Sequence, residues 1–433
     1  MATTVVPSRK GASRKFVITG GNRLAGEYPV QGNKNAALPL ICAALLARAP
    51  VLLRHVPRID DVDNLLLLIQ ALGVEVEWQS EELLLDSSNL ESNELPAQLV
   101  ERLRGAVLLL APLAAAFDPI SCAIPGGCPI GRRSFDIHWR VFEAAGYTVD
   151  EGLGTIELKR TTQVREPRVY LEESSVTATE NALLLFGALG AGTIENPARE
   201  PHVFSLIEFL NLMGCEIELH PLYFRIVRGV NQGRREIEFD VPPDYTDAGT
   251  IAIATAVTGG DVLIRGIRNQ EMMGIQTVLR RFGIGLEFVT ATDLKVGPSS
   301  LKNPSQVTAG PWPLFPTDLV SLAIVLATQT SGLCLIHDWM YEARMFFVDK
   351  LVRMGAHITM CDPHRVLVEG PSRLRGKRLE SPDIRAGMAL LVAGLCAEGE
   401  TVIEHGEVVL RGYEKVTERL RNIGAQISEE QRQ

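Results

Sequence analysis

The residue with the most reactive surroundings in this sequence is Cys128, which lies in the segment PGGCPIGRR at residues 125–133. Three glycines and two prolines in nine residues predict a loop that works as a lid and not a packed strand. A thiol exposed beside the guanidinium groups of Arg132 and Arg133 is expected to have a lowered pKa and to be reactive. The alternative is that Cys128 is a small apolar filler, as we expect for the cysteines inside hydrophobic runs.

Residues that could bind anions recur at the predicted starts of buried helices. They are Lys34 and Asn35 in GNKNAALP, Arg104 in ERLRG, Asp318 in FPTD, and Asp383 and Arg385 in SPDIRAG. A helix start presents unpaired N–H groups and a partial positive charge, so it favours a bound anion. N-capping explains Asn and Asp at such positions equally well. It does not explain Lys34, Arg104 or Arg385, because a cation is unfavourable there unless an anion lies nearby.

Arginine recurs in a second set of loops, each of which follows a predicted inner strand. The set comprises Arg58, Arg132 and Arg133, Arg199, Arg265 and Arg268, Arg344, and Arg411. Ordinary surface arginine is one interpretation. The other is a ring of guanidinium groups on one rim, which would bind a small, multiply charged anion through bidentate contacts.

These loops belong to a repeated unit of the chain. An amphipathic helix that ends in glycine and leads into a short strand occurs six times, with the glycines at positions 73, 146, 214, 283, 355 and 424. Their spacings of 73, 68, 69, 72 and 69 residues predict six copies of one unit. Glycine after the last helical turn adopts the left-handed conformation that ends a helix.

Each unit also contains an apolar helix rich in Ala and Leu, such as ICAALLARAPVLLRHV or LLVAGLCAEGETVIEH. These helices are apolar nearly all round and are expected to be buried, whereas the glycine-terminated helices carry charges and are expected to face solvent. Each unit therefore predicts the order strand, buried helix, strand, surface helix, strand, strand. Six such units in 433 residues predict an α/β protein with two domains of three units, buried helices inside and sheets outside.

Composition narrows the class of protein. A net charge of −9 argues against a nucleic-acid partner, because such proteins need a basic face. Seven scattered cysteines without a C-x-x-C pair, and eight histidines without a ligand cluster, predict reduced thiols, no metal site and a cytosolic location. The first fifteen residues lack the apolar run of a signal peptide, and no apolar stretch approaches the ~20 residues of a membrane span, so no membrane partner is expected.

Several motifs occur together in one order: QGNKNAALP, IPGGCPIGRR, ENPAREP, FPTD, MGAH and LRGYE. On these motifs the chain resembles the enolpyruvyl transferases, from about residue 16 to residue 428. The resemblance implies a two-domain inside-out α/β barrel in which each domain has three βαβαββ units. One domain would be residues 35–242, and the other would combine residues 1–34 with residues 243–433.

The resemblance also implies a reaction and its residues. The enolpyruvyl group of phosphoenolpyruvate would move to the 3-hydroxyl of UDP-N-acetylglucosamine, with release of phosphate and without a cofactor. Cys128 would be the general acid, also able to add to the phosphoenolpyruvate carbon. Asp318 would accept the hydroxyl proton or orient it. Lys34, Arg133 and Arg411 would hold the phosphate, and Arg344 and Arg385 the carboxylate. The acceptor would contact Asn35, Arg104, Asp136 and Asp383.

The chain departs from the family pattern mainly at positions on the nucleotide side. They are Ser134, Phe135, Glu173, Thr177 and Tyr245, with Ala343 and Leu410 as further changes. None of these positions is among the proposed catalytic residues. Two alternatives therefore remain: a transferase that acts on another nucleotide or nucleotide sugar, and a non-catalytic paralogue that binds a nucleotide sugar.

Overall fold

The computed structural model describes residues 13–126, 131, 134–231 and 236–431 of the chain. These residues form two compact units, each with its own hydrophobic core. Unit 1 consists of the described residues from Gly32 to Pro242, except Gly131. Unit 2 consists of Gly131, the described residues before Gly32 and those from Pro243 onward. Cys128 and Arg133 lie outside the described residues.

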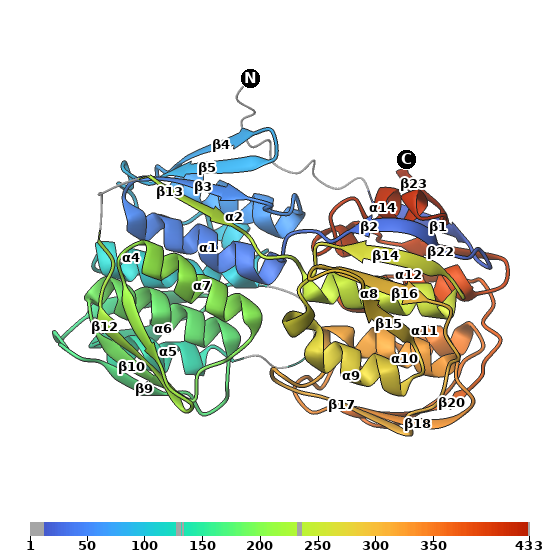
Figure 1. Ribbon diagram of the computed structural model, residues 1–433. Helices are drawn as coiled ribbons and strands as arrows, with labels where there is room; N and C mark the ends of the chain where they lie inside the picture. The colour runs from blue at the N-terminus through green and yellow to red at the C-terminus, as the bar shows by residue number, and fades with distance from the viewer. Residues whose placement is uncertain (1–12, 127–130, 132–133, 232–235, 432–433) are drawn as a thin grey trace. The chain divides into compact units, whose positions relative to one another are not determined.

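Unit 1 contains three sheets and seven α-helices (Figure 1). The sheets have the orders β13 (Ile237–Asp240)–β3 (Pro50–Arg54)–β5 (Glu82–Asp86)–β4 (Glu75–Gln79), β6 (Ile120–Ala123)–β8 (Thr155–Arg160)–β7 (Tyr147–Glu151), and β11 (Glu216–Leu219)–β12 (Tyr223–Arg228)–β10 (Gly192–Glu195)–β9 (Arg168–Tyr170). The helices are α1 (Lys34–Ala47), α2 (Asp60–Ala71), α3 (Ala97–Val100), the 3₁₀ helix η1 (Arg104–Leu109), α4 (Leu110–Ala116), α5 (Asp136–Ala144), α6 (Val176–Leu189) and α7 (Pro201–Leu212).

Unit 2 also contains three sheets. Their orders are β15 (Gly285–Phe288)–β16 (Asp293–Gly297)–β14 (Asp261–Arg265)–β2 (Ala25–Pro29), β17 (Gln306–Ala309)–β18 (Gly332–Asp338)–β20 (Arg365–Gly370)–β19 (His357–Asp362), and β21 (Arg378–Glu380)–β22 (Glu400–Glu404)–β1 (Arg14–Thr19)–β23 (Gln426–Gln431). The helices are α8 (Tyr245–Val257), η2 (Asn269–Met272), α9 (Met273–Arg281), η3 (Thr317–Leu319), α10 (Val320–Thr328), α11 (Val348–Arg353), α12 (Ile384–Cys396), α13 (Glu407–Leu410) and α14 (Val416–Asn422).

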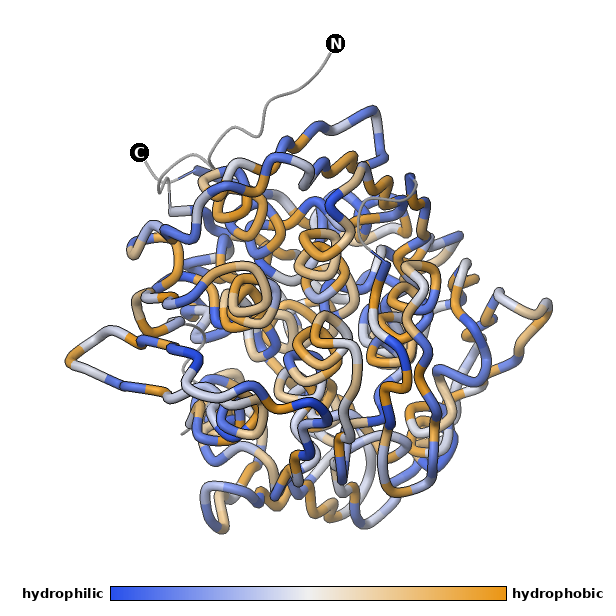
Figure 2. The backbone as a smooth tube through the Cα atoms, turned by 90° about the vertical axis from the view of Figure 1, so that its left-hand side faces the viewer, coloured by the Kyte–Doolittle hydropathy of each residue, from blue (hydrophilic) through white to orange (hydrophobic). Residues whose placement is uncertain are grey.

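The helices predicted to be apolar all round are buried. Every residue of α10 is buried, and so is every residue of α1 from Ala36 to Ala47. Several helical coils in Figure 2 are accordingly coloured mainly in the hydrophobic range. The predicted site residues stand at the N-terminal ends of these helices or in the turns that lead into them.

The six glycine stops are confirmed. Gly73, Gly146, Gly214, Gly283, Gly355 and Gly424 all have φ between 78° and 105°, the left-handed region that costs a residue with a Cβ. The expectation that every glycine-terminated helix faces solvent is wrong for α2 and α7. Both pack against α1 and are largely buried, because runs such as LLLLI and FSLIEFL make them apolar over most of their surface.

The predicted strand order holds except in the second and sixth repeats. In the sixth, one described strand, β23, follows α14 where two were expected. The second repeat has a three-stranded sheet and no strand in the segment before its buried helix, where ESNELP lacks an alternating apolar pattern. Distant segments complete other sheets: β13 pairs in parallel with β3, β2 pairs in parallel with β14, and β1 pairs with β22 and β23. The repeat count and the α/β class are confirmed.

Two negative observations hold for the described part of the chain. No helix there is long and apolar enough to cross a membrane. Among the same residues, no group of three or more His, Cys, Asp or Glu side chains could hold a metal ion.

Candidate active site

A cluster of charged side chains surrounds Asp318 in unit 2, in the 3₁₀ turn that leads into α10. Its two carboxylate oxygens accept hydrogen bonds from two arginines: Arg344 Nη2 lies 3.1 Å from Oδ1 and Arg385 Nη2 lies 2.7 Å from Oδ2. The Asp318 side chain is 25% exposed, whereas those of Arg344 and Arg385 are 2% and 7% exposed. The carboxylate is therefore held in one orientation and still reaches solvent.

Arg344 is held by a second carboxylate. Its Nε lies 3.9 Å from Oδ2 of Asp338, a fully buried residue at the end of β18. The same oxygen accepts a hydrogen bond from the hydroxyl of Thr317, next to Asp318. Two acidic groups thus fix the Arg344 guanidinium, and the backbone N–H of Met340 adds a further bond to Asp338 at 3.0 Å.

Arg385 follows the first residue of α12 and is held on both sides. Its Nη1 donates to the hydroxyl of fully buried Tyr413 at 2.9 Å, and that hydroxyl lies 3.2 Å from Oγ1 of Thr250. Burial lowers the pKa of Arg385, but Asp318 and the neighbouring Tyr413 and Asp244 raise it by more, so the net shift is upward. Arg385 is therefore a fixed cation.

Asp383 is the N-cap of α12, because its Oδ1 accepts hydrogen bonds from the N–H groups of Arg385 and Ala386 at 2.9 and 3.0 Å. This is the capping role that its residue type also predicted. The cap fixes the start of the helix that carries Arg385.

Arg411 stands at the end of α13, on a turn that a distant glutamine holds in place. Gln31 Nε2 donates to the carbonyl of Gly412 at 2.9 Å, and Gln31 Oε1 accepts from the N–H of Glu414 at 2.8 Å. A Cβ on Gly412 would lie 2.5 Å from Cγ2 of Ile384, so glycine is needed for the turn to pack against α12. The positions of Arg411 and Arg385 are linked through this contact.

In unit 1, Lys34 is the first residue of α1 and pairs with an acid. Its Nζ lies 3.1 Å from Oδ2 of Asp61, at the start of α2, and the Lys34 side chain is 14% exposed. The N-cap of α1 is Asn33, whose Oδ1 accepts from the N–H groups of Asn35 and Ala36 at 2.8 and 3.2 Å. The cap is thus the residue before the predicted pair, and both Lys34 and Asn35 remain partly exposed.

Arg104 begins η1 and covers an aromatic ring. Its guanidinium lies 4.2 Å from the ring centroid of Phe135, and its Nη2 donates to the carbonyl of Ser134 at 3.3 Å. Phe135 is 8% exposed and also contacts the Trp139 ring. Phe135 therefore serves as a support for Arg104, while Asp136 is exposed at the start of α5.

A buried histidine connects α5 to α6 behind this contact. His138 Nδ1 lies 2.9 Å from Nδ2 of Asn181, and its Nε2 lies 3.1 Å from Oγ1 of Thr177. Burial, and the charge of Arg104, lower the pKa of His138 to about 3, so the ring is neutral. Thr177, one of the departures from the family pattern, thus has a structural partner.

Four members of the proposed arginine ring contact side chains of neighbouring elements. Arg58 stacks on Trp78, Arg199 on Phe224, Arg265 pairs with Glu27 and Asp293, and Arg268 pairs with Glu271. Of the sequence-predicted residues, the structure brings Asp318, Arg344 and Arg385 together in unit 2, with Asp383 capping the same helix.

Several residues of this arrangement were not predicted. Asp61, Asp338, Tyr413 and Gln31 each hold a predicted residue or its turn in place. The Asp-Asp pair at residues 60–61 and the tyrosine of RGYE were visible signals for two of them. Gln31 was visible as part of the motif QGNKNAALP, but its partners Gly412 and Glu414 lie 381 and 383 residues away. No such signal marked Asp338, although its partner Arg344 follows it closely in the chain.

The chain is similar to known proteins both in sequence and in fold. The family model described as EPSP synthase (3-phosphoshikimate 1-carboxyvinyltransferase) matches residues 18–420. The protein of Bradyrhizobium diazoefficiens named UDP-N-acetylglucosamine 1-carboxyvinyltransferase is 40% identical over 424 residues, which cover 95% of this chain and 97% of that protein. The protein of the same name from Treponema denticola is 38% identical over 425 residues, with 95% and 98% covered.

Solved structures show the same fold. The enolpyruvyl transferase NikO from Streptomyces tendae superimposes with a TM-score of 0.87 at 24% identity, over 97% of this chain and 100% of that chain. An EPSP synthase from Acinetobacter baumannii gives a TM-score of 0.74 at 19% identity, with 97% and 100% covered.

Proposed function

The chain belongs to the enolpyruvyl transferase family, and from this premise we propose that it acts on UDP-N-acetylglucosamine. The reaction moves the enolpyruvyl group of phosphoenolpyruvate to the 3-hydroxyl of the sugar and releases phosphate. It would be the first committed step of peptidoglycan precursor synthesis, in the cytoplasm, on which cell shape and division depend. Full-length relatives at 38–40% identity carry the name of this activity, which favours this acceptor over the alternatives.

The observation that carries the mechanism is the arrangement of Asp318 between two arginines. The reaction needs the methylene carbon of phosphoenolpyruvate to gain a proton and the sugar hydroxyl to lose one while its oxygen bonds to the adjacent carbon. Asp318 suits the second task, because a carboxylate fixed by Arg344 and Arg385 and partly open to solvent can accept the hydroxyl proton. The tetrahedral adduct then loses phosphate and a methyl proton to restore the double bond.

The two arginines also have donors left for a substrate carboxylate. A guanidinium has five N–H donors, and Arg385 uses Nη1 for Tyr413 and Nη2 for Asp318. We assign Arg344 and Arg385 to the carboxylate of phosphoenolpyruvate, and Lys34, Arg133 and Arg411 to its phosphate. Lys34, the first residue of α1, is suited to phosphate binding because its pairing with Asp61 already fixes its amino group.

The remaining assignments follow the family motifs. Cys128 is the general acid that protonates the methylene carbon, and it is the residue that the epoxide fosfomycin would alkylate. The acceptor is contacted by Asn35, Arg104, Asp136 and Asp383. In this group, the guanidinium of Arg104 is supported by the ring of Phe135.

One assay tests the function and its alternatives. Phosphate release is measured with phosphoenolpyruvate and UDP-N-acetylglucosamine, and then with other nucleotides and nucleotide sugars as acceptors. Release with the first acceptor is expected. Release with another acceptor alone would replace this substrate, and no release with any acceptor would point to a binding paralogue.

The role of Cys128 is tested separately by mass spectrometry. The protein is incubated with fosfomycin in the presence of UDP-N-acetylglucosamine, and the peptide that contains Cys128 is examined. A mass increase of one fosfomycin molecule on Cys128 is expected, while the other six cysteines should stay unmodified. An unmodified Cys128 would contradict its role as a reactive thiol.

A further inference from the structure

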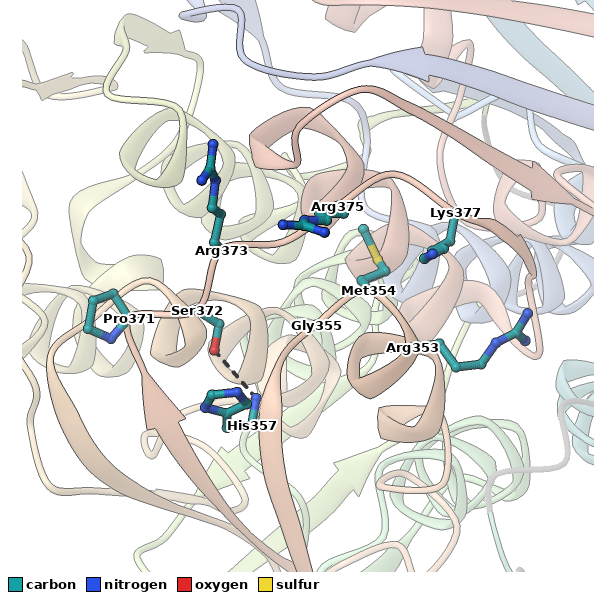
Figure 3. A pocket seen from close by; sticks show the side chains of 9 residues that line it. All are labelled: Arg353, Met354, Gly355, His357, Pro371, Ser372, Arg373, Arg375 and Lys377. Atoms are coloured by element: carbon teal, nitrogen blue, oxygen red, sulfur yellow. Dashed lines mark hydrogen bonds between the residues drawn. The ribbon is translucent and has the colours of Figure 1, made fainter.

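Unit 2 has a basic hollow in its surface, lined by residues outside the arrangement around Asp318 (Figure 3). Its volume is about 450 Å³, and its lining residues are Arg353, Met354, Gly355, His357, Pro371, Ser372, Arg373, Arg375 and Lys377. No acidic residue and no Phe, Tyr or Trp side chain is part of this lining. Four of the nine residues carry a positive charge at neutral pH, in a chain whose net charge is −9.

The charges face the hollow because of a simple alternation in the segment before β21. Residues 372–377 read Ser-Arg-Leu-Arg-Gly-Lys, and in an extended segment alternate side chains point to the same side. Arg373, Arg375 and Lys377 are exposed, whereas Leu374, between them, is 2% exposed and packs into the core. Three cations are thereby placed on one face by the segment itself.

Arg353 adds a fourth cation from another element, the last residue of α11. Figure 3 shows Arg353 and Met354 coming from this helix end, with Arg375 and Lys377 from the facing segment. The two parts are tied together, because the N–H of Arg375 donates to the carbonyl of Met354 at 2.8 Å. The cations of the hollow therefore do not depend on one flexible loop.

The floor of the hollow is also fixed. Ser372 is 7% exposed, its N–H donates to the carbonyl of Thr328 at 2.7 Å, and its hydroxyl accepts from the N–H of His357 at 3.4 Å. Gly355 has φ of 105°, and a Cβ there would lie 3.2 Å from the carbonyl oxygen of Arg373. Glycine thus allows the end of α11 and the basic segment to approach closely.

Two of the cations lack a partner within the residues that the structure describes. Arg375 and Lys377 make no side-chain hydrogen bond or ion pair there, whereas Arg373 pairs with Glu398 and Arg353 donates to the carbonyl of Arg378 at 3.4 Å. Acidic residues stand beside the lining: Glu398 and Glu400 on the neighbouring segment, and Glu369, which faces His357 across the β19–β20 pair. Four cations line the same hollow and repel one another, so a bound anion would relieve the repulsion.

We propose that this hollow is a second anion site, which binds a small polyphosphate chain independently of the reaction. Guanidinium groups suit phosphate oxygens, because they donate in pairs. The volume lies within the range of about 300–1,000 Å³ that is typical of small-ligand pockets. Since no Phe, Tyr or Trp ring lines the hollow and its charge comes from arginine and lysine, the phosphate chain and not a nucleobase is recognised.

The test is binding of tripolyphosphate by calorimetry to the full chain, at low and at physiological salt. We expect saturable binding that weakens as salt rises. In the variant R375Q/K377Q the Kd should rise at least about tenfold, which corresponds to about 1.4 kcal/mol of binding free energy. The matched control R280Q/R421Q removes two exposed arginines elsewhere in unit 2 and should bind as the unaltered chain does. ATP should bind no more tightly than tripolyphosphate.

Binding at the reaction site is distinguished by a second variant and by turnover. Arg385→Gln should retain tripolyphosphate binding, and R375Q/K377Q should retain turnover in the absence of tripolyphosphate. Loss of binding in Arg385→Gln, or equal affinity in R375Q/K377Q and its control, would overturn the proposal. So would binding of an acidic peptide such as poly-glutamate without any binding of tripolyphosphate. None of these outcomes depends on which acceptor the enzyme uses.

Discussion

The substitution Tyr413→Phe tests whether Arg385 acts from a fixed position. The hydroxyl of Tyr413 accepts a hydrogen bond from Arg385 Nη1 at 2.9 Å in fully buried surroundings. Its removal leaves a charged donor without a partner, which costs about 1–3 kcal/mol of folding free energy. Because the same guanidinium holds Asp318, the misplaced group should also lower kcat/KM by about tenfold to a hundredfold, as small displacements of catalytic groups do.

Stability is measured by urea unfolding and activity by phosphate release. Tyr147→Phe is the matched control, because Tyr147 is also buried and its hydroxyl also accepts a hydrogen bond from an arginine, Arg160 Nε at 3.0 Å. It contacts neither Arg385 nor Asp318, so it should lose similar stability and keep its kcat/KM. Equal kcat/KM in both variants would refute the reasoning that Tyr413 positions Arg385.

Three further predictions concern neighbouring groups. Asp318→Asn should lower kcat by about 10²–10⁴-fold in the phosphate assay, because the amide cannot accept the hydroxyl proton, while its circular dichroism spectrum stays unchanged. Activity near that of the unaltered chain would exclude Asp318 as the base. Gly412→Ala should cost about 1–3 kcal/mol in urea unfolding, since its Cβ would meet Ile384 Cγ2 at 2.5 Å, and unchanged stability would show that the turn can shift. Burial lowers the pKa of His138 from 6.5 to about 3, so the stability that the neutral ring contributes is present above pH 6.5 and is lost as the pH falls toward 3. The free energy of unfolding of His138→Gln should therefore fall less between pH 7 and pH 4.5 than that of the unaltered chain, and an equal fall would contradict this.

Much of the fold was predictable because it repeats. Six glycine stops at near-equal spacing, and helices that are apolar all round, each report a local physical requirement: a left-handed residue at a helix end, or burial on every side. The exceptions, α2 and α7, show where this reasoning fails. A helix with a wide apolar surface can be buried even when its pattern includes charges, because the neighbouring helix α1 covers it.

The residues of the candidate site could be predicted from their types and motifs, but the residues that they contact could not. Lys34, Arg385 and Asp318 were recognisable because cations at helix starts are unfavourable without an anion and because their motifs are specific. The pairings that hold them were not predictable, since Asp61 is 27 residues from Lys34 and Tyr413 is 28 residues from Arg385. No local pattern encodes such distant pairs.

The central claim is that this chain transfers an enolpyruvyl group to UDP-N-acetylglucosamine. The most direct test is mass spectrometry of the nucleotide sugar after incubation with phosphoenolpyruvate and the protein. The claim predicts that the mass of the sugar nucleotide rises by one enolpyruvyl group, that one phosphate is released for each product, and that Asp318→Asn largely abolishes both. An unchanged nucleotide sugar in the presence of the folded, unaltered chain would contradict it.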